Sequence, residues 1–384
     1  MRKKISLFIL ALCVLIQIGV ISYRAYQNAP KDFTKIDIQE YADSFHYYYN
    51  HLSQNGKIAY TVILKQIQSF PKEIEIPYIT QEEYDAVFLA LSYDNPKLFF
   101  LENSSEMHTR GEHYYFLPKY RLSKEDYQVQ LKELVQKAEQ ICNSMPQNAS
   151  DFQKELFFHD FICLHTLYNA SPPVGYTAYD ALVIGDTVCE GYARAMQLLL
   201  NQVNIPNYLV TGMIEDFDEL GHKTTEGHMW NIVELEGNPY HLDVTWDDVG
   251  EHRTDYFQHN YFNVTDQEIA ATHKKISPEN NNCHFLECNY FVKTQSRFSD
   301  YNSFTEESIR NLMKDAVSNG DFEFEIQFST SVAYQKGKKE LVKDGKIFQI
   351  LKSVDSQLYK QCKDISYIQS EELGTIQFIM KKEK

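Results

Sequence analysis

Apolar residues recur at helical spacing in several segments of the chain, and a residue typical of a helix N-cap precedes four of these segments. Ser and Thr side chains accept hydrogen bonds from the free N–H groups of a first helical turn, so such residues mark helix starts. The pattern predicts helices that open at Thr80, Ser123, Ser150 and Thr305. Asn95-Pro96 and Asn319-Gly320 predict where the first and the last of these helices end.

The sequence predicts strands at 114–117, 207–214, 228–235, 239–246, 322–328 and 375–380. Apolar and polar residues alternate in 228–235, 239–246 and 322–328, whereas 114–117 is an apolar run typical of a short buried strand. The segment 322–328 alternates so regularly that we expect one of its faces to be exposed to water. Between 228–235 and 239–246, Glu236-Gly237-Asn238 indicates a hairpin turn. A two-residue loop at Glu236-Gly237 would pair Leu235 with Asn238 and place His228 and Asp243 on one face of the sheet.

The N-terminal segment has the pattern of a membrane anchor. Arg2, Lys3 and Lys4 precede an apolar run over residues 5–23, which as a helix would be about 28 Å long, close to the thickness of a bilayer core. The basic cluster would remain cytoplasmic, so we expect a single-pass protein with the rest of the chain outside the cell membrane. A cleaved signal peptide, which would give a secreted protein, is the alternative.

A chain of 384 residues suggests several domains. The pattern predicts an anchor at 1–24, a tether and N-terminal α/β region at 25–122, a core at 123–290 and a small α+β domain at 291–384. The overall fold class is therefore α+β.

Charge excludes one class of partner. The formal net charge is −16, and removal of residues 1–24 takes away four basic residues and no acidic one, which leaves −20. A nucleic-acid partner would require clustered Lys and Arg, so we expect none. Neutral or basic partners are favoured.

The cysteine pattern predicts neither a disulfide scaffold nor a metal site. Cys283 and Cys288 are close enough in sequence to form a disulfide, or they could be two buried free thiols. Cys283, His284 and Cys288 lack a fourth ligand at the spacing of a zinc site, and we predict no metal and no cofactor.

Three residues in the middle of the chain suggest nucleophilic catalysis. Cys189 lies where a loop becomes a helix, and the free N–H groups of a helix start stabilise a thiolate. His228 could accept the thiol proton, and Asp243 could orient the imidazole. Taken singly, each has a simpler interpretation: a buried inert thiol, a surface histidine and a turn acid.

These residues lie in two segments, VCEGYARAMQLLLNQVNIPNYLVTG and GHMWNIVELEGNPYHLDVTWDD. In the order Cys, His, Asp, the segments resemble the transglutaminase-like superfamily of bacterial type, and the resemblance covers roughly residues 150–265. It implies a papain-like core in which a helix bearing the Cys packs on an antiparallel sheet bearing the His and the Asp. It also implies Cys189 as nucleophile, His228 as general acid/base and Asp243 as its orienting partner.

Other parts of the site are less determined by the resemblance. The Cys189 N–H is one expected oxyanion donor, and the loop 176–180 is a possible source of the second. Four residues of the family pattern are interpreted as packing and hairpin-end residues: Trp230, Trp246, Asp247 and Asp248.

The resemblance implies an enzyme that acts on amide bonds of proteins or peptides through a Cys thioester, by acyl transfer or by hydrolysis. Cell-wall or surface proteins are the expected substrates of a domain outside the membrane. The alternative is a non-enzymatic cell-surface scaffold or interaction module that retains the fold.

Overall fold

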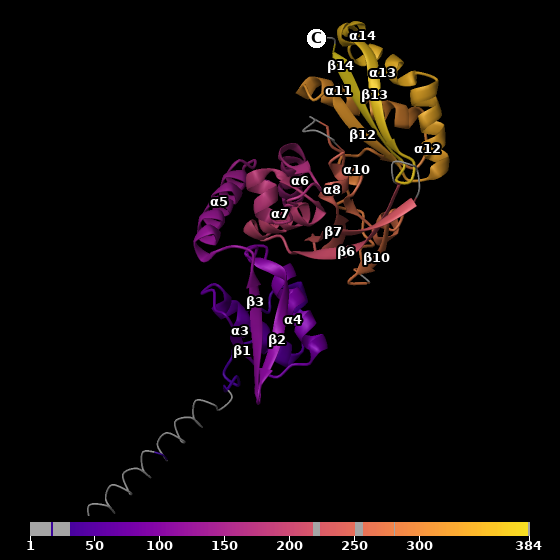
Figure 1. The fold of residues 1–384 in the computed structure, drawn as a ribbon. Helices are drawn as coiled ribbons and strands as arrows, with labels where there is room; N and C mark the ends of the chain where they lie inside the picture. The colour runs from indigo at the N-terminus through magenta and orange to yellow at the C-terminus, as the bar shows by residue number, and fades with distance from the viewer. Residues whose placement is uncertain (1–16, 18–30, 218–222, 250–255, 280, 383–384) are drawn as a thin grey trace, which may run out of the picture. The chain divides into compact units, whose positions relative to one another are not determined.

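The computed structural model describes residues 17, 31–217, 223–249, 256–279 and 281–382 (Figure 1). The predicted anchor at 1–24 lies outside these residues except for Gln17. None of the helices within the described ranges combines the length and the hydropathy that a membrane span needs. The chain divides into two compact units, one of residues 1–92 with 101–121 and the other of residues 93–100 with 122–384.

The first unit is a three-stranded antiparallel sheet with helices packed on it. The strand order is β1-β3-β2. Its elements are α2 (Tyr47–Asn50), α3 (Gln54–Ile67), β1 (Ile74–Ile76), α4 (Gln81–Tyr93), β2 (Leu101–Arg110) and β3 (His113–Tyr120). Tyr84 and Phe88 of α4 pack their rings against Phe116, which is buried in β3.

The second unit is built round a five-stranded antiparallel sheet in the order β10-β6-β7-β8-β9. The strands are β6 (Asn207–Phe217), β7 (Lys223–Leu235), β8 (Asn238–Leu242), β9 (Phe262–Val264) and β10 (His273–Ser277). The principal helices are α5 (Lys124–Asn143), α6 (Asp151–His165) and α7 (Cys189–Gln202). Helix α7 packs on β6 and β7 and is buried over most of its length, so the α+β architecture with a Cys-bearing helix on an antiparallel sheet is the one predicted (Figure 1).

Short elements connect these parts of the second unit. They are β4 (Leu167–Tyr168), η1 (Asp180–Ile184), β5 (Asp186–Thr187), α8 (Val244–Asp247), α9 (Asp266–Ile269) and α10 (Tyr290–Lys293).

The C-terminal part of the second unit has its own four-stranded sheet, in the order β11-β12-β14-β13, and its own hydrophobic cluster. Its strands are β11 (Arg297–Phe298), β12 (Glu323–Phe328), β13 (Cys362–Ser370) and β14 (Thr375–Lys382). Its helical elements are α11 (Ser303–Asn319), α12 (Ser331–Lys338), η2 (Lys339–Lys343), α13 (Lys346–Val354) and α14 (Ser356–Gln361). This part belongs to the same compact unit as the central sheet.

Most predicted helix starts are confirmed, and one is wrong. The Ser123 hydroxyl accepts the Asp126 N–H, and Ser150 forms a capping box with Gln153. Helix α11, in contrast, begins two residues before Thr305, because Asn302 accepts the N–H groups of Phe304 and Thr305. The Thr305 hydroxyl does not cap a helix and instead donates to the Asp300 carbonyl.

The expectation of a water-exposed face on 322–328 is wrong. Strand β12 lies inside its sheet, between β11 and β14, and its polar residues Glu325 and Gln327 are buried. Both have polar partners there: Glu325 accepts from His259, and the Gln327 amide donates to the Leu373 carbonyl at 3.1 Å. The alternation in β12 therefore reflects two buried faces of the strand, one apolar and one polar.

The hairpin turn is confirmed, but the second strand is shorter than predicted. Leu235 pairs with Asn238, and Glu236 and Gly237 have φ values of 54° and 78°. Strand β8 ends at Leu242, so the prediction of strand over 243–246 is wrong. Asp243 ends the strand because its carboxylate accepts the N–H groups of Thr245 and Trp246 and so begins the short helix α8.

The left-handed turn residue Gly237 sets the register of this hairpin, and we expect Gly237→Ala to destabilise the protein by about 1–2 kcal/mol, since a Cβ is disfavoured at positive φ. Urea unfolding would measure the change. Gly227→Ala, in the same hairpin's strand β7, is the matched control, because a Cβ there has open space and ordinary φ. Equal stability of the two variants would contradict the turn geometry.

Candidate active site

The first turn of α7 carries Cys189. Val188, in extended conformation, is the N-cap, and the Cys189 side chain is partly exposed at the first helical position. Gly191 follows two residues later, where a Cβ would lie 1.9 Å from the Thr187 Oγ1. A side chain at position 191 would therefore force the strand β5 away from the helix start, which explains the glycine of the Cys-Glu-Gly-Tyr segment.

The sheet brings His228 and Asp243 into direct contact. Nε2 of His228, in β7, lies 2.7 Å from Oδ2 of Asp243, which follows β8, and both side chains are buried. The other oxygen, Oδ1, accepts the N–H groups of Thr245 and Trp246 at 3.1 and 3.3 Å. The carboxylate is thus fixed in the direction that holds the imidazole.

The charges of the site favour an imidazolium at position 228. Burial alone would lower the pKa of His228, but the charge of Asp243, its hydrogen bond and the interaction with the Cys189 thiol together raise that pKa to about 10. Burial opposes the charged form of Asp243 as well, yet His228 and His273 hold the pKa of this carboxyl well below its ordinary value. Because Nε2 of His228 is bonded to Asp243, Nδ1 is left for the thiol.

Aromatic side chains hold the imidazole from its faces. The Trp230 ring stacks on His228 with centroids 5.8 Å apart, and its indole N–H donates to Nδ1 of His241 at 3.0 Å. Nε2 of His241 donates in turn to Asp266 at 2.8 Å. Trp246 lies against His228 at 6.1 Å. The two tryptophans thus have packing contacts with the imidazole.

The candidate oxyanion donors differ in whether their N–H groups are already hydrogen-bonded within the protein. The Cys189 N–H is at the first position of α7, where no preceding helical carbonyl can accept it, and so it can donate to a substrate oxygen. In the loop 176–180, the N–H groups of Tyr176 and Thr177 already donate to Oδ2 of Asp180, each at 3.0 Å. These two groups are therefore poor choices for the second donor, which stays unassigned.

A second histidine on the Asp243 carboxylate was missed in the sequence. Nε2 of His273, in β10, lies 3.0 Å from the same Oδ2 that holds His228, and Nδ1 lies 2.9 Å from the Thr272 hydroxyl. Burial is the largest influence and lowers the pKa of His273 despite its bond to Asp243, so the ring is neutral at pH 7. A neutral ring whose Nδ1 accepts from Thr272 must donate through Nε2. His273 is accordingly a positioning residue for Asp243.

No local sequence signal marks His273, since it is 30 residues from Asp243 and follows an ordinary polar segment. Only the pairing of β10 with β6, at the edge of the sheet, brings it to the site.

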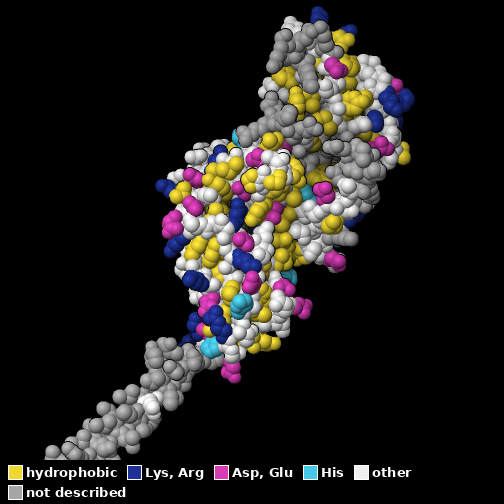
Figure 2. Space-filling model, viewed as in Figure 1, with side chains coloured by type: hydrophobic (Ala, Val, Ile, Leu, Met, Phe, Trp, Pro, Cys, Tyr) yellow, Lys and Arg dark blue, Asp and Glu magenta, His cyan; other side chains and the backbone are white. Residues whose placement is uncertain are grey.

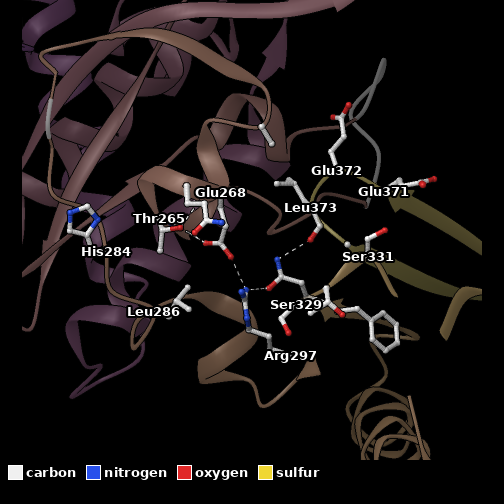
Figure 3. A pocket seen from close by; sticks show the side chains of 16 residues that line it. Thr265, Glu268, His284, Leu286, Arg297, Ser329, Ser331, Glu371, Glu372 and Leu373 are labelled. Atoms are coloured by element: carbon white, nitrogen blue, oxygen red, sulfur yellow. Dashed lines mark hydrogen bonds and ion pairs between the residues drawn. The ribbon is translucent and has the colours of Figure 1, made fainter. Parts of the chain in front are cut away.

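Other residues singled out in the sequence lie outside the triad of Cys189, His228 and Asp243. Cys283 and Cys288 are buried free thiols rather than a disulfide. Asp248 accepts the Tyr192 hydroxyl at 2.5 Å and so ties α7 to the end of α8. A cavity of about 540 Å³, lined among others by Glu268, Arg297 and Glu372, contains none of the three triad residues (Figure 3).

Comparison with known proteins finds a family match in the central region. Residues 138–244 match the family model of the transglutaminase-like superfamily. No curated protein matches the chain. Solved structures give weak similarity: a candidate cysteine protease from Cytophaga hutchinsonii (11% identity, TM-score 0.25) and a protein described as a TGase (13% identity, TM-score 0.27). The matches cover 37% and 54% of this chain and 61% and 58% of those chains, less than two thirds of either relative.

We expect His273→Ala to shift the pH dependence of Cys189 alkylation. Loss of the N–H donor raises the pKa of Asp243, so the carboxylate becomes protonated at higher pH and the acidic limb of the alkylation rate moves up by about one pH unit. Iodoacetamide labelling followed by mass spectrometry would measure the limb. His273→Gln, which keeps an N–H near the Nε2 position, should restore much of it. A His273→Ala profile that superimposes on the wild type would refute the positioning role.

Proposed function

Because residues 138–244 match the transglutaminase-like superfamily, we propose that this chain is a cysteine enzyme that acts on amide bonds of proteins or peptides through a thioester on Cys189. The observation that carries the proposal is the hydrogen bond between His228 and the buried Asp243, with the Cys189 thiol as the other partner of the same imidazole.

The proposed chemistry gives each of the three residues a role. The Cys189 thiolate attacks the amide carbonyl carbon, and the N–H of Cys189 stabilises the oxygen of the tetrahedral intermediate. The C–N bond then breaks, and the His228 imidazolium gives its proton to the leaving nitrogen. This step leaves a thioester on Cys189 and a neutral imidazole that Asp243 keeps oriented.

The second half of the reaction decides the product. An amine or a water molecule attacks the thioester carbon, His228 accepts its proton, and the thiolate of Cys189 leaves. With an amine the product is a new amide, and with water it is a free acid. Both reactions use the same three residues, so the proposal includes acyl transfer and hydrolysis.

Location and substrates are part of the proposal. Residues 1–24 have the sequence pattern of an anchor, and a catalytic domain outside the membrane would meet cell-wall or surface proteins. The net charge of −16 favours neutral or basic substrates. Among the described residues on the face drawn in Figure 2, acidic and basic side chains are intermixed.

The proposal predicts a reactive thiolate at Cys189. At pH 6.5 an ordinary thiol, with a pKa near 8.5, is about 1% thiolate, so stabilisation by the His228 imidazolium should accelerate iodoacetamide labelling of Cys189 by up to about 100-fold. His228→Ala should remove this advantage. Mass spectrometry of the labelled chain would measure both rates, with free N-acetylcysteine as the reference thiol.

Two outcomes decide the matter. Rapid labelling that is lost in His228→Ala would support the thiolate–imidazolium pair, and incubation with glutamine-containing proteins, with and without a primary amine, would then distinguish transfer from hydrolysis. Labelling of Cys189 at the rate of the free reference thiol, with no effect of His228→Ala, would overturn the enzyme proposal and favour the non-enzymatic scaffold.

A further inference from the structure

A second cluster of ionisable side chains lies in the same unit, outside the triad. His159 and Asp160 come from α6, and His259 comes from the loop before β9. Oδ1 of Asp160 lies 2.9 Å from Nδ1 of His159 and 3.1 Å from Nε2 of His259. One ligand atom from each residue lies within 4.8 Å of the others. The two histidines are buried, whereas the Asp160 side chain is about one third exposed.

The far nitrogen of each imidazole is held by a further carboxylate. Nε2 of His159 lies 3.2 Å from Oδ2 of Asp247, which is fully buried. Nδ1 of His259 lies 2.8 Å from Oε1 of Glu325, whose other oxygen accepts the backbone N–H of His259 at 3.0 Å. A carboxylate at the far nitrogen favours a proton there, so the near nitrogen of each ring is the one that can offer a lone pair to a cation beside Asp160.

Two nitrogen lone pairs beside the Asp160 carboxylate would repel its negative charge, so a positive charge must lie between these groups. The cluster has three carboxylates, Asp160, Asp247 and Glu325, and only two imidazoles. Two extra protons could supply the charge, one on each ring. A single divalent cation supplies both charges at one point, and the carboxylate–histidine–metal arrangement is the one in which metal-binding histidines are ordinarily found.

The other two histidine-carboxylate clusters of the described residues lack this arrangement. In the cluster of His228, Asp243 and His273, each histidine has a use in the proposed chemistry. In the cluster of His241, Asp266 and Cys283, the far nitrogen of His241 accepts the Trp230 indole N–H, and no carboxylate holds it. Of the three clusters, the His159 cluster is therefore the one in which each of two histidines has a carboxylate at its far nitrogen.

We propose that His159, Asp160 and His259 bind one divalent cation of the zinc class through Nδ1, Oδ1 and Nε2. Two nitrogens and one oxygen suit zinc and its first-row neighbours better than calcium or magnesium, which prefer oxygen ligands alone. Bonds of about 2.1 Å place neighbouring tetrahedral ligands about 3.4 Å apart, so the separations of 2.9 and 3.1 Å between Asp160 and the two rings need to widen only slightly. The exposed side of Asp160 leaves room for water as a fourth ligand.

Such an ion would stabilise the contact between the central sheet and the C-terminal sheet. Glu325 lies in β12 of the C-terminal sheet, and both of its oxygens bind His259. Glu325, on the polar face of β12, would then orient His259 as a ligand of the ion. Binding of the ion to the folded chain should therefore raise the unfolding temperature.

The test uses the full chain with Cys189→Ala, so that the thiol of the triad cannot capture the ion. After treatment with a chelator, Zn²⁺ is titrated by calorimetry and Co²⁺ by visible absorption. We expect one ion per chain and a higher unfolding temperature with Zn²⁺. Asp160→Asn should weaken binding at least about 10-fold, and Glu325→Gln, behind His259, by about 10–100-fold. His165→Gln, at an exposed histidine of the same helix, should leave the affinity unchanged.

Three results would overturn the site. The first is the absence of Zn²⁺ binding by the chelator-treated Cys189→Ala chain, which carries no substitution in the proposed site. The second is unchanged affinity in a folded Asp160→Asn or His259→Gln chain. The third is a thiolate-to-cobalt charge-transfer band, which would place the ion on a cysteine instead. Each readout is independent of enzymatic activity, so the cation site and the proposed function can fail separately.

Discussion

The buried carboxylate of Asp243 is the interaction on which the site depends. A carboxylate removed from water is costly unless donors replace the lost hydration, and Asp243 receives four: two backbone N–H groups of α8 and the Nε2 atoms of His228 and His273. These donors come from a helix start and from two strands, β7 and β10, that do not pair with each other. The same charge that keeps His228 protonated therefore also fastens the edge strand β10 to the centre of the sheet.

A similar solution recurs where the C-terminal sheet meets the central one. Glu325, buried in β12, is satisfied by His259, which also faces Asp160 of α6. Polar groups cover one face of β12, while Ile326 and Phe328 enter the hydrophobic cluster on the other. Ionic contacts of this kind fix geometry, because each carboxylate is costly in any arrangement that leaves it unpaired. This explains why the C-terminal part, with a core of its own, still belongs to the unit that holds the site.

Local signals in the sequence were sufficient for much of the fold. Ser123 and Ser150 cap their helices as predicted because a cap involves only residues three apart. The left-handed pair Glu236-Gly237 fixed the hairpin register for the same reason, and that register directed His228 towards Asp243. The failures at Asp243–Trp246 and on β12 arose where a side chain had a competing partner, either a nearby N–H group or a residue 66 positions away. The residues 1–24 lie outside the described part of the structure apart from Gln17, and the anchor stays a prediction.

The sequence by itself determined the α+β class, the helix that begins at Cys189, and His228 and Asp243 as neighbours on one hairpin, because caps, turns and alternation are short-range properties of the chain. Tertiary structure alone decided that His273 shares the Asp243 carboxylate with His228. It also decided that His159 and His259 both contact Asp160, each with a further carboxylate, Asp247 or Glu325, at its other nitrogen. These contacts join residues 30 to 99 positions apart in sequence. Their pairing depends on which strands become neighbours and on which buried charges need partners, and no local pattern records either.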